Sequence, residues 1–115
     1  MLRILLVEDS PDDAELLRFA LDDAGIDHEM RRAWSRASLL EALGDFAPSV
    51  AVSDLHLPGF CGAEALRMVQ AQLPGLPMVL LSGAPAEAPG DLPAQVLDKA
   101  ALHGLPALLR GMLAA

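Results

Sequence analysis

The sequence predicts an α/β fold in which a doubly wound parallel sheet carries helices on both faces. Apolar runs alternate with segments of helical period along all 115 residues, and five such pairs can be counted. The runs are mostly continuous instead of alternating with polar residues, which is typical of strands buried on both faces. The length suits one domain with its own core, so we expect a single domain over residues 1–115.

The first strand and helix carry the clearest markers. Residues 2–7 form an apolar run that two acidic residues end. Ser10 is a typical N-cap and Pro11 suits the first helical position, after which apolar residues recur at helical spacing until Gly25. We therefore expect a strand over 2–7 and a helix that begins at Pro11.

The middle of the chain continues the alternation. Residues 27–33 are polar and predict an edge strand, and the helix that follows should end near Pro48. Residues 50–52 predict a short central strand that ends just before Asp54. A loop over 55–62 and a third helix are expected next.

The last third of the chain contains two further apolar runs and a proline-rich connection. Strands are expected over 78–81 and 95–97, and a final helix should carry the apolar residues of 105–112. Eleven residues, 83–93, must connect these strands, whereas a parallel crossover generally needs about a dozen. Prolines interrupt this connection, so its helix should be short, near residues 85–88, or absent.

The composition argues against several classes of protein. Apolar residues make up 53% of the chain, too many for a disordered tail. No apolar run approaches the roughly 20 residues of a membrane span, and the amino-terminal run is too short for a signal peptide. The net charge of −8 opposes direct binding to nucleic acid. Because a signal peptide and a membrane span are both missing from the pattern, we expect a cytoplasmic protein without membrane contact. The single cysteine, Cys61, can form no internal disulfide and is consistent with a reducing compartment.

Carboxylate, hydroxyl or ammonium side chains lie at the ends of four of the five predicted strands. They are Glu8 and Asp9 after the first strand, Asp54 after the third, Ser82 after the fourth and Lys99 after the fifth. In a doubly wound sheet these strand ends meet where ligands bind. Three clustered carboxylates repel one another and call for a cation; Mg²⁺ suits them, with a backbone carbonyl near residue 56 and water as further ligands. A lysine and a hydroxyl that bind phosphoryl oxygens would complete a site for phosphoryl transfer.

Two motifs resemble those of response-regulator receiver domains. Residues 4–13, ILLVEDSPDD, are similar to the opening of that family, and residues 53–62, SDLHLPGFCG, are similar to its phosphoacceptor loop. The resemblance covers nearly the whole chain and implies a flavodoxin-like sheet of strand order 2-1-3-4-5. The loop together with Leu-Ser-Gly at 81–83 is similar to receivers found beside sensor kinases and cyclic-dinucleotide enzymes.

The resemblance also implies a function and a role for each residue of the site. The chain would be a phosphoacceptor switch of a two-component phosphorelay, a regulator and not an enzyme acting on other substrates. Its partners would be a sensor histidine kinase or phosphotransfer protein and an output domain or protein. The implied Mg²⁺ ligands are Glu8, Asp9, Asp54 and the backbone carbonyl of His56, and the implied phosphoryl-handling residues are Asp54 as phosphoacceptor, Ser82 and Lys99.

Some features depart from the family pattern and leave other interpretations open. Val96 stands where the family usually has an aromatic residue that relays phosphorylation, and Ala100 replaces a usual proline. A binding scaffold of receiver fold without phosphate control is therefore a second hypothesis. A Mg²⁺ phosphatase is a third, although no second general acid or base accompanies Asp54. Taken singly, Asp54 and Ser82 also suit turns, and Lys99 suits an exposed surface.

Overall fold

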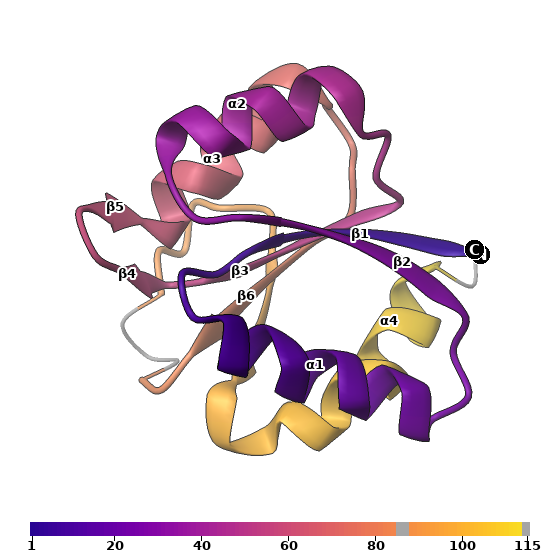
Figure 1. Ribbon diagram of the computed structural model, residues 1–115. Coiled ribbons are helices and arrows are strands. Elements are labelled where there is room, and N and C mark those ends of the chain that lie inside the picture. Colours follow the sequence, from indigo (N-terminus) through magenta and orange to yellow (C-terminus); the bar gives the residue numbers. More distant parts are fainter. Residues whose placement is uncertain (85–87, 114–115) are drawn as a thin grey trace.

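The computed structural model describes residues 1–84 and 88–113, which form three layers with a sheet in the middle (Figure 1). Five of the strands are longer than two residues, and one short 3₁₀ helix precedes the last α-helix. In chain order the elements are β1 (Leu2–Val7), α1 (Pro11–Asp23), β2 (His28–Ala33), α2 (Arg36–Asp45), β3 (Val50–Asp54), β4 (His56–Leu57), β5 (Phe60–Cys61), α3 (Gly62–Gln72), β6 (Met78–Ser82), β7 (Gln95–Asp98), the 3₁₀ helix η2 (Lys99–Gly104) and α4 (Leu105–Leu113).

The central sheet has five parallel strands in the order β2-β1-β3-β6-β7. Once the β4–β5 hairpin is set apart, this is the predicted order 2-1-3-4-5, so the fold prediction is confirmed. The register pairs Val7 with Ser53, Asp54 with Leu81, and Ser82 with Asp98. The carboxyl ends of β1, β3, β6 and β7 therefore meet at the same end of the sheet.

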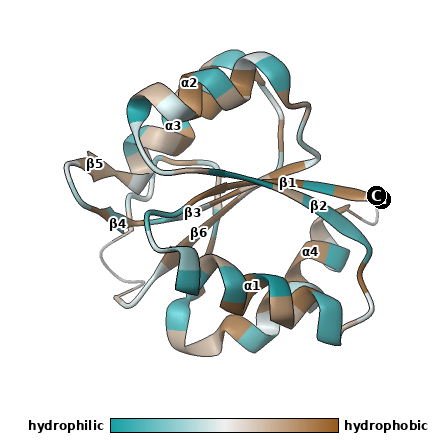
Figure 2. Ribbon diagram, viewed as in Figure 1, coloured by the Kyte–Doolittle hydropathy of each residue, from teal (hydrophilic) through white to brown (hydrophobic). Residues whose placement is uncertain are grey.

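Helices cover both faces of this sheet. Helices α2 and α3 lie on one face, and α1, η2 and α4 lie on the other (Figure 1). Leu5 and Val7 of β1 enter the cluster under α2 and α3, whereas Ile4 and Leu6 enter the cluster under α1 and α4. Because each strand face meets a helix layer, the inner strands are mostly apolar without alternation, and Figure 2 shows them largely brown, with a teal band in β1.

The residues predicted to begin and end the first helix have these roles in α1. The side chain of Ser10 accepts a hydrogen bond from the backbone N–H of Asp13 at 3.2 Å, and Pro11 occupies the start of the helix. Gly25 follows the C-cap with φ of +72°, a conformation that glycine adopts at little cost. The predicted edge strand over 27–33 is β2, which pairs on one side only, with β1.

The predicted loop over residues 55–62 was wrong in part, because it contains the hairpin β4–β5. Leu57 pairs with Phe60 across a two-residue turn of Pro58 and Gly59. Gly59 has φ of +66°, which permits so tight a reversal. Two strands of two residues each are too short to produce a periodic pattern in the sequence.

The connection between β6 and β7 contains no helix among its described residues, 83–84 and 88–94. The helical turn predicted near residues 85–88 falls largely on 85–87, which lie outside the described residues. Leu92 is buried in the cluster under α2 and α3, with Ala88 and Ala94 packed against it. These three side chains therefore cover part of the sheet face that a longer crossover helix would cover.

Candidate functional site

The candidate site lies at the carboxyl-terminal end of the sheet. Glu8 directly follows β1, Asp54 ends β3, Ser82 ends β6 and Lys99 directly follows β7. Glu8, Asp54 and Ser82 are only 3%, 5% and 0% exposed, whereas Asp9 is exposed. The fold thus buries two carboxylates, those of Glu8 and Asp54, and buried charge requires compensation.

Two donors compensate the carboxylate of Asp54. The ammonium of Lys99 donates to Asp54 Oδ2 at 2.7 Å, although the residues are 45 positions apart in the sequence. The backbone N–H of His56 donates to Asp54 Oδ1 at 3.3 Å. Both oxygens of the predicted phosphoacceptor are therefore held, one by a charge and one by the chain itself.

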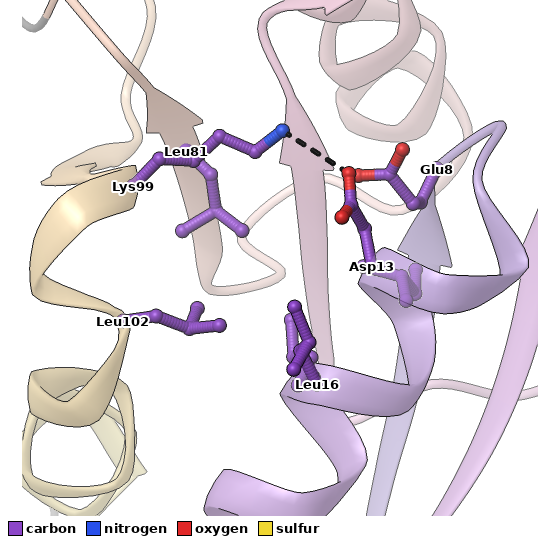
Figure 3. A pocket seen from close by; sticks show the side chains of 8 residues that line it. Glu8, Asp13, Leu16, Leu81, Lys99 and Leu102 are labelled. Carbon is purple, nitrogen blue, oxygen red and sulfur yellow. Dashed lines mark ion pairs between the residues drawn. The ribbon is translucent and has the colours of Figure 1, made fainter.

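Lys99 stands between two carboxylates. Its ammonium is also 3.6 Å from Asp13 Oδ2 at the start of α1, the ion pair drawn as a dashed line in Figure 3. Burial lowers the pKa of Lys99, but the hydrogen bond and the charge of Asp54 outweigh it, so the pKa lies above its usual value. The lysine is consequently charged at neutral pH. The sequence analysis missed Asp13, which lies in the first turn of a helix, where acidic residues are common for another reason.

The carboxyl of Glu8 has a strongly shifted pKa. Burial is the main cause, and the hydrogen bond with Asp9 and the charge of Asp54 act in the same direction, so the pKa of Glu8 rises to about 7. A hydrogen bond from the Ser10 backbone N–H to Glu8 Oε1 at 3.1 Å opposes the rise, as does Lys99. The groups around the buried carboxyl of Glu8 therefore compensate its charge only in part.

These residues suit Mg²⁺ by their chemistry. No three His, Cys, Asp or Glu side chains within residues 1–84 and 88–113 gather closely enough to hold a metal ion. Instead, the carboxylate of Asp54 pairs with Lys99, and the carboxyl of Glu8 accepts a hydrogen bond from the backbone N–H of Ser10. Mg²⁺ usually binds through one or two carboxylates and keeps several waters, so it does not need a complete cage. The oxygen donors and the unbalanced charge fit this ion, and the ligand set stays a prediction.

An apolar pocket of about 250 Å³ lies beneath the charged groups. In Figure 3 the head groups of Glu8, Asp13 and Lys99 point toward one another above the side chains of Leu16, Leu81 and Leu102. The full lining is Leu6, Glu8, Asp13, Leu16, Leu17, Leu81, Lys99 and Leu102. The lower part of this pocket is therefore apolar, whereas the side chains of Lys99 and Asp13 at its rim are partly exposed.

Gly62 is a second residue that the sequence analysis missed as part of the site. It begins α3, and its N–H donates to the carbonyl of Leu55 at 2.9 Å. A Cβ at Gly62 would overlap the carbonyl oxygen of Asp54 and lie 2.7 Å from the carbonyl carbon. Only a residue without a side chain lets the hairpin close against the end of β3, and a glycine at the start of a predicted helix is the one local sign of this.

The raised pKa of Glu8 predicts that the chain loses stability as pH rises from about 4.5 to about 7 without Mg²⁺. Over this window the folded state binds a proton at Glu8 that the unfolded state has released, so the free energy of unfolding falls, by up to about 3 kcal/mol. Below this window the contribution is fully present. Urea unfolding at several pH values, with Glu8→Gln as the matched variant, measures the effect. Parallel pH curves for the two proteins would contradict it.

Comparison with known proteins agrees with the doubly wound fold. A model of the response regulator receiver domain matches residues 4–100. The chain therefore belongs to the response regulator receiver family, whose members act in two-component signalling.

Three relatives illustrate the match. A protein-glutamate methylesterase/protein-glutamine glutaminase of Nitrosospira multiformis is 30% identical over 92% of this chain and 30% of its own length. The DNA-binding response regulator MtrA of Mycolicibacterium smegmatis is 36% identical over 70% of this chain and 34% of its own length. The crystal structure of the response regulator TrrA of Thermotoga maritima, in complex with Mg²⁺ and BeF, has a TM-score of 0.80 and 24% identity, covering 98% of this chain and 100% of that one.

The chain spans about a third of the length of these two curated relatives. In the part of the chain that the structure describes, no helix has both the length and the apolar character to cross a bilayer.

Proposed function

We propose that residues 1–115 form a single receiver domain that works as a phosphoacceptor switch in a two-component phosphorelay. Asp54 would accept a phosphoryl group from the phosphohistidine of a partner kinase or phosphotransfer protein, in a reaction that requires Mg²⁺. The observation that carries this proposal is the contact of 2.7 Å between Lys99 and a nearly buried Asp54 at the end of β3. The contact supports the proposal because a carboxylate and a fixed positive charge lie together at the end of the sheet where ligands of such folds bind.

The metal would be held by Glu8, Asp9 and Asp54 with the backbone carbonyl of His56. When bound, Mg²⁺ would neutralise the carboxylates and the incoming phosphoryl oxygens, which supplies much of the catalysis in phosphoryl transfer. An oxygen of Asp54 attacks phosphorus, the bond from phosphorus to the histidine nitrogen breaks, and the nitrogen keeps the electron pair. Lys99 then exchanges its contact with Asp54 Oδ2 for a contact with a phosphoryl oxygen.

Ser82 has a hydrogen-bond donor available for the phosphoryl group. Its hydroxyl oxygen accepts a hydrogen bond from the backbone N–H of Ala84 at 3.0 Å. A hydroxyl has one donor and two acceptor sites, so this bond leaves the O–H to donate to a phosphoryl oxygen. Phosphorylation would therefore pull on the residues that directly follow β6. Val96 in β7 is 40% exposed and offers no aromatic ring for the relay that is usual in the family.

Incubation with acetyl phosphate, followed by measurement of the intact mass, tests the proposal. We expect one phosphoryl group per chain with Mg²⁺ and none when the metal is chelated. A folded chain that takes up no phosphate under either condition would favour the binding scaffold. Turnover of a small phosphoester without stable labelling would favour the phosphatase.

We further propose that the phosphodonor protein contacts the outer face of α1. Leu16 and Phe19 on this face are 58% and 62% exposed, although both are large and apolar. Both side chains line an open groove between α1 and η2, which Lys99 also lines. The acidic flank of the groove, Asp22 and Asp23, and the net charge of −8 favour a protein surface that combines apolar and basic side chains.

Phe19→Ala should slow phosphotransfer from a kinase that phosphorylates the chain by about tenfold or more, because exposed aromatics are frequent hot spots of binding. Labelling by acetyl phosphate, which needs no docking surface, should be unchanged. Leu40→Ala is the matched control, since Leu40 is a half-exposed apolar residue of α2, on the opposite side of the sheet. If the kinase phosphorylated wild type and Phe19→Ala at equal rates, the outer face of α1 would not be the contact surface of the phosphodonor.

A further inference from the structure

The turn that carries the acid pair Glu8 and Asp9 is fastened to the edge strand β2 by two hydrogen bonds. The backbone N–H of Glu8 donates to the carbonyl of Ala33 at 2.9 Å. The carbonyl of Glu8 accepts a hydrogen bond from Nη1 of Arg32 at 3.0 Å. Since the last paired residues of the two strands are Val7 and Ala33, the side chain of Arg32 holds the chain just beyond the end of the ladder.

The carbonyl of Glu8 accepts from a side chain because the backbone N–H groups that follow β2 donate to another acceptor. In a parallel ladder, the carbonyl of Glu8 would next accept from the backbone N–H of Ser35. That N–H donates instead to the hydroxyl of Ser38 at 3.0 Å, and the N–H of Trp34 donates to the same hydroxyl at 2.9 Å. Ser35 is the N-cap of α2, and its capping box requires this arrangement. The guanidinium of Arg32 therefore replaces a ladder donor that the start of α2 has taken.

Arg32 is itself held in place by the single tryptophan of the chain. Its guanidinium lies over the ring of Trp34, 4.9 Å from the ring centre, and the ring is half exposed. Among the described residues Arg32 forms no ion pair, whereas its neighbour Arg31 pairs with Asp45 at 2.9 Å. The guanidinium of Arg32 thus contacts the carbonyl of Glu8 and the ring of Trp34, next to the carboxyl end of β2.

We propose that Arg32 is a positioning residue for the acid pair: by holding the carbonyl of Glu8, it keeps Glu8 and Asp9 where their carboxylates can bind Mg²⁺. This inference rests on the proposed metal-dependent function. The charge of Arg32 and its positioning role would change the affinity for Mg²⁺ in opposite directions, so a measured affinity distinguishes them. The positive charge of Arg32 opposes the approach of a cation, so removal of the charge alone would strengthen Mg²⁺ binding. Loss of positioning would weaken it.

Calorimetric titration of the whole chain with Mg²⁺ shows whether loss of the Arg32 side chain raises or lowers the affinity. We expect Arg32→Ala to bind Mg²⁺ about tenfold more weakly, the size of effect usual for groups that orient metal ligands. Arg31→Ala is the matched control, because it removes the same charge from the same strand but leaves the carbonyl of Glu8 held. Its affinity should be unchanged or slightly higher. Arg32→Lys keeps a charged donor and should recover part of the lost affinity.

The rate of labelling by acetyl phosphate supplies a second readout. In Arg32→Ala the Mg²⁺ concentration for half-maximal rate should rise, while the maximal rate at saturating Mg²⁺ stays near that of wild type. If wild type binds Mg²⁺ and Arg32→Ala binds it equally or more tightly, the positioning role is wrong and the proposed function stands. If wild type binds no Mg²⁺, both are wrong. If Arg32→Ala fails to fold, the Mg²⁺ affinity of Arg32→Lys is compared with that of Arg31→Ala. Equal Mg²⁺ affinities of these two variants would overturn the proposal.

Discussion

Replacement of Asp54 by asparagine is expected to abolish phosphorylation by acetyl phosphate in the presence of Mg²⁺. The amide is a far weaker nucleophile than the carboxylate, and the substitution also removes one of the proposed Mg²⁺ ligands. It also removes the carboxylate that Lys99 contacts at 2.7 Å, so the fixed charge turns toward Asp13, now 3.6 Å away. Intact mass before and after incubation measures the loss.

The control for this experiment is Asp12→Asn, which removes an equal charge from an exposed position in the first turn of α1. Its labelling should match that of wild type. Uptake of one phosphoryl group by Asp54→Asn at the wild-type rate would show that another residue is the acceptor, and the proposed roles would then be wrong.

Gly62→Ala is expected to destabilise the fold by about 3 kcal/mol, at the upper end for overpacking, because the new methyl group meets backbone and not a flexible side chain. The atoms it would meet are the carbonyl group of Asp54 and the Cα of Leu55. The end of β3 must therefore move, and the carboxylate of Asp54 moves with it. We expect slower labelling by acetyl phosphate together with a lower midpoint of urea unfolding.

Gly44→Ala is the matched control for this substitution. Gly44 lies in α2, where an added Cβ would have nothing within 4 Å. Alanine is the better helix former, so this variant should gain roughly 0.5–1 kcal/mol and label normally. If both variants changed stability in the same direction and by the same amount, the close approach of Gly62 to β3 would carry no energetic weight.

The secondary structure was predictable where the sequence carries local signals. The apolar run of β1, the N-cap Ser10 and the left-handed Gly25 define the first strand and helix, and the structure confirms them. The hairpin β4–β5 was missed because its strands have two residues each. The 3₁₀ helix η2, from Lys99 to Gly104, was missed as well, because six residues are too few to show a periodic pattern in the sequence.

The candidate site was predictable in part, for a topological reason. Glu8, Asp54, Ser82 and Lys99 each lie where a parallel strand ends, and the right-handed crossovers of such folds carry successive strand ends to one end of the sheet. The sequence does not indicate which of these groups touch. The pairing of Lys99 with Asp54, the burial of Glu8 and the exposure of Asp9 depend on how the strand ends and helices pack together.

The parallel sheet, the segments that form its main strands and the residues that end them could be read from the sequence, because continuous apolar runs and capping residues act over a few neighbouring positions. The contacts of Asp13, Gly62 and Arg32 could not, because they depend on how the folded segments pack. Asp13 reaches Lys99 across the gap between α1 and η2, Gly62 lies against the carbonyl of Asp54, and Arg32 reaches the carbonyl of Glu8 from a neighbouring strand. The contacts of Asp13 and Arg32 join segments that are distant in the chain, and all three residues meet backbone atoms or single charges that leave no periodic pattern in the sequence.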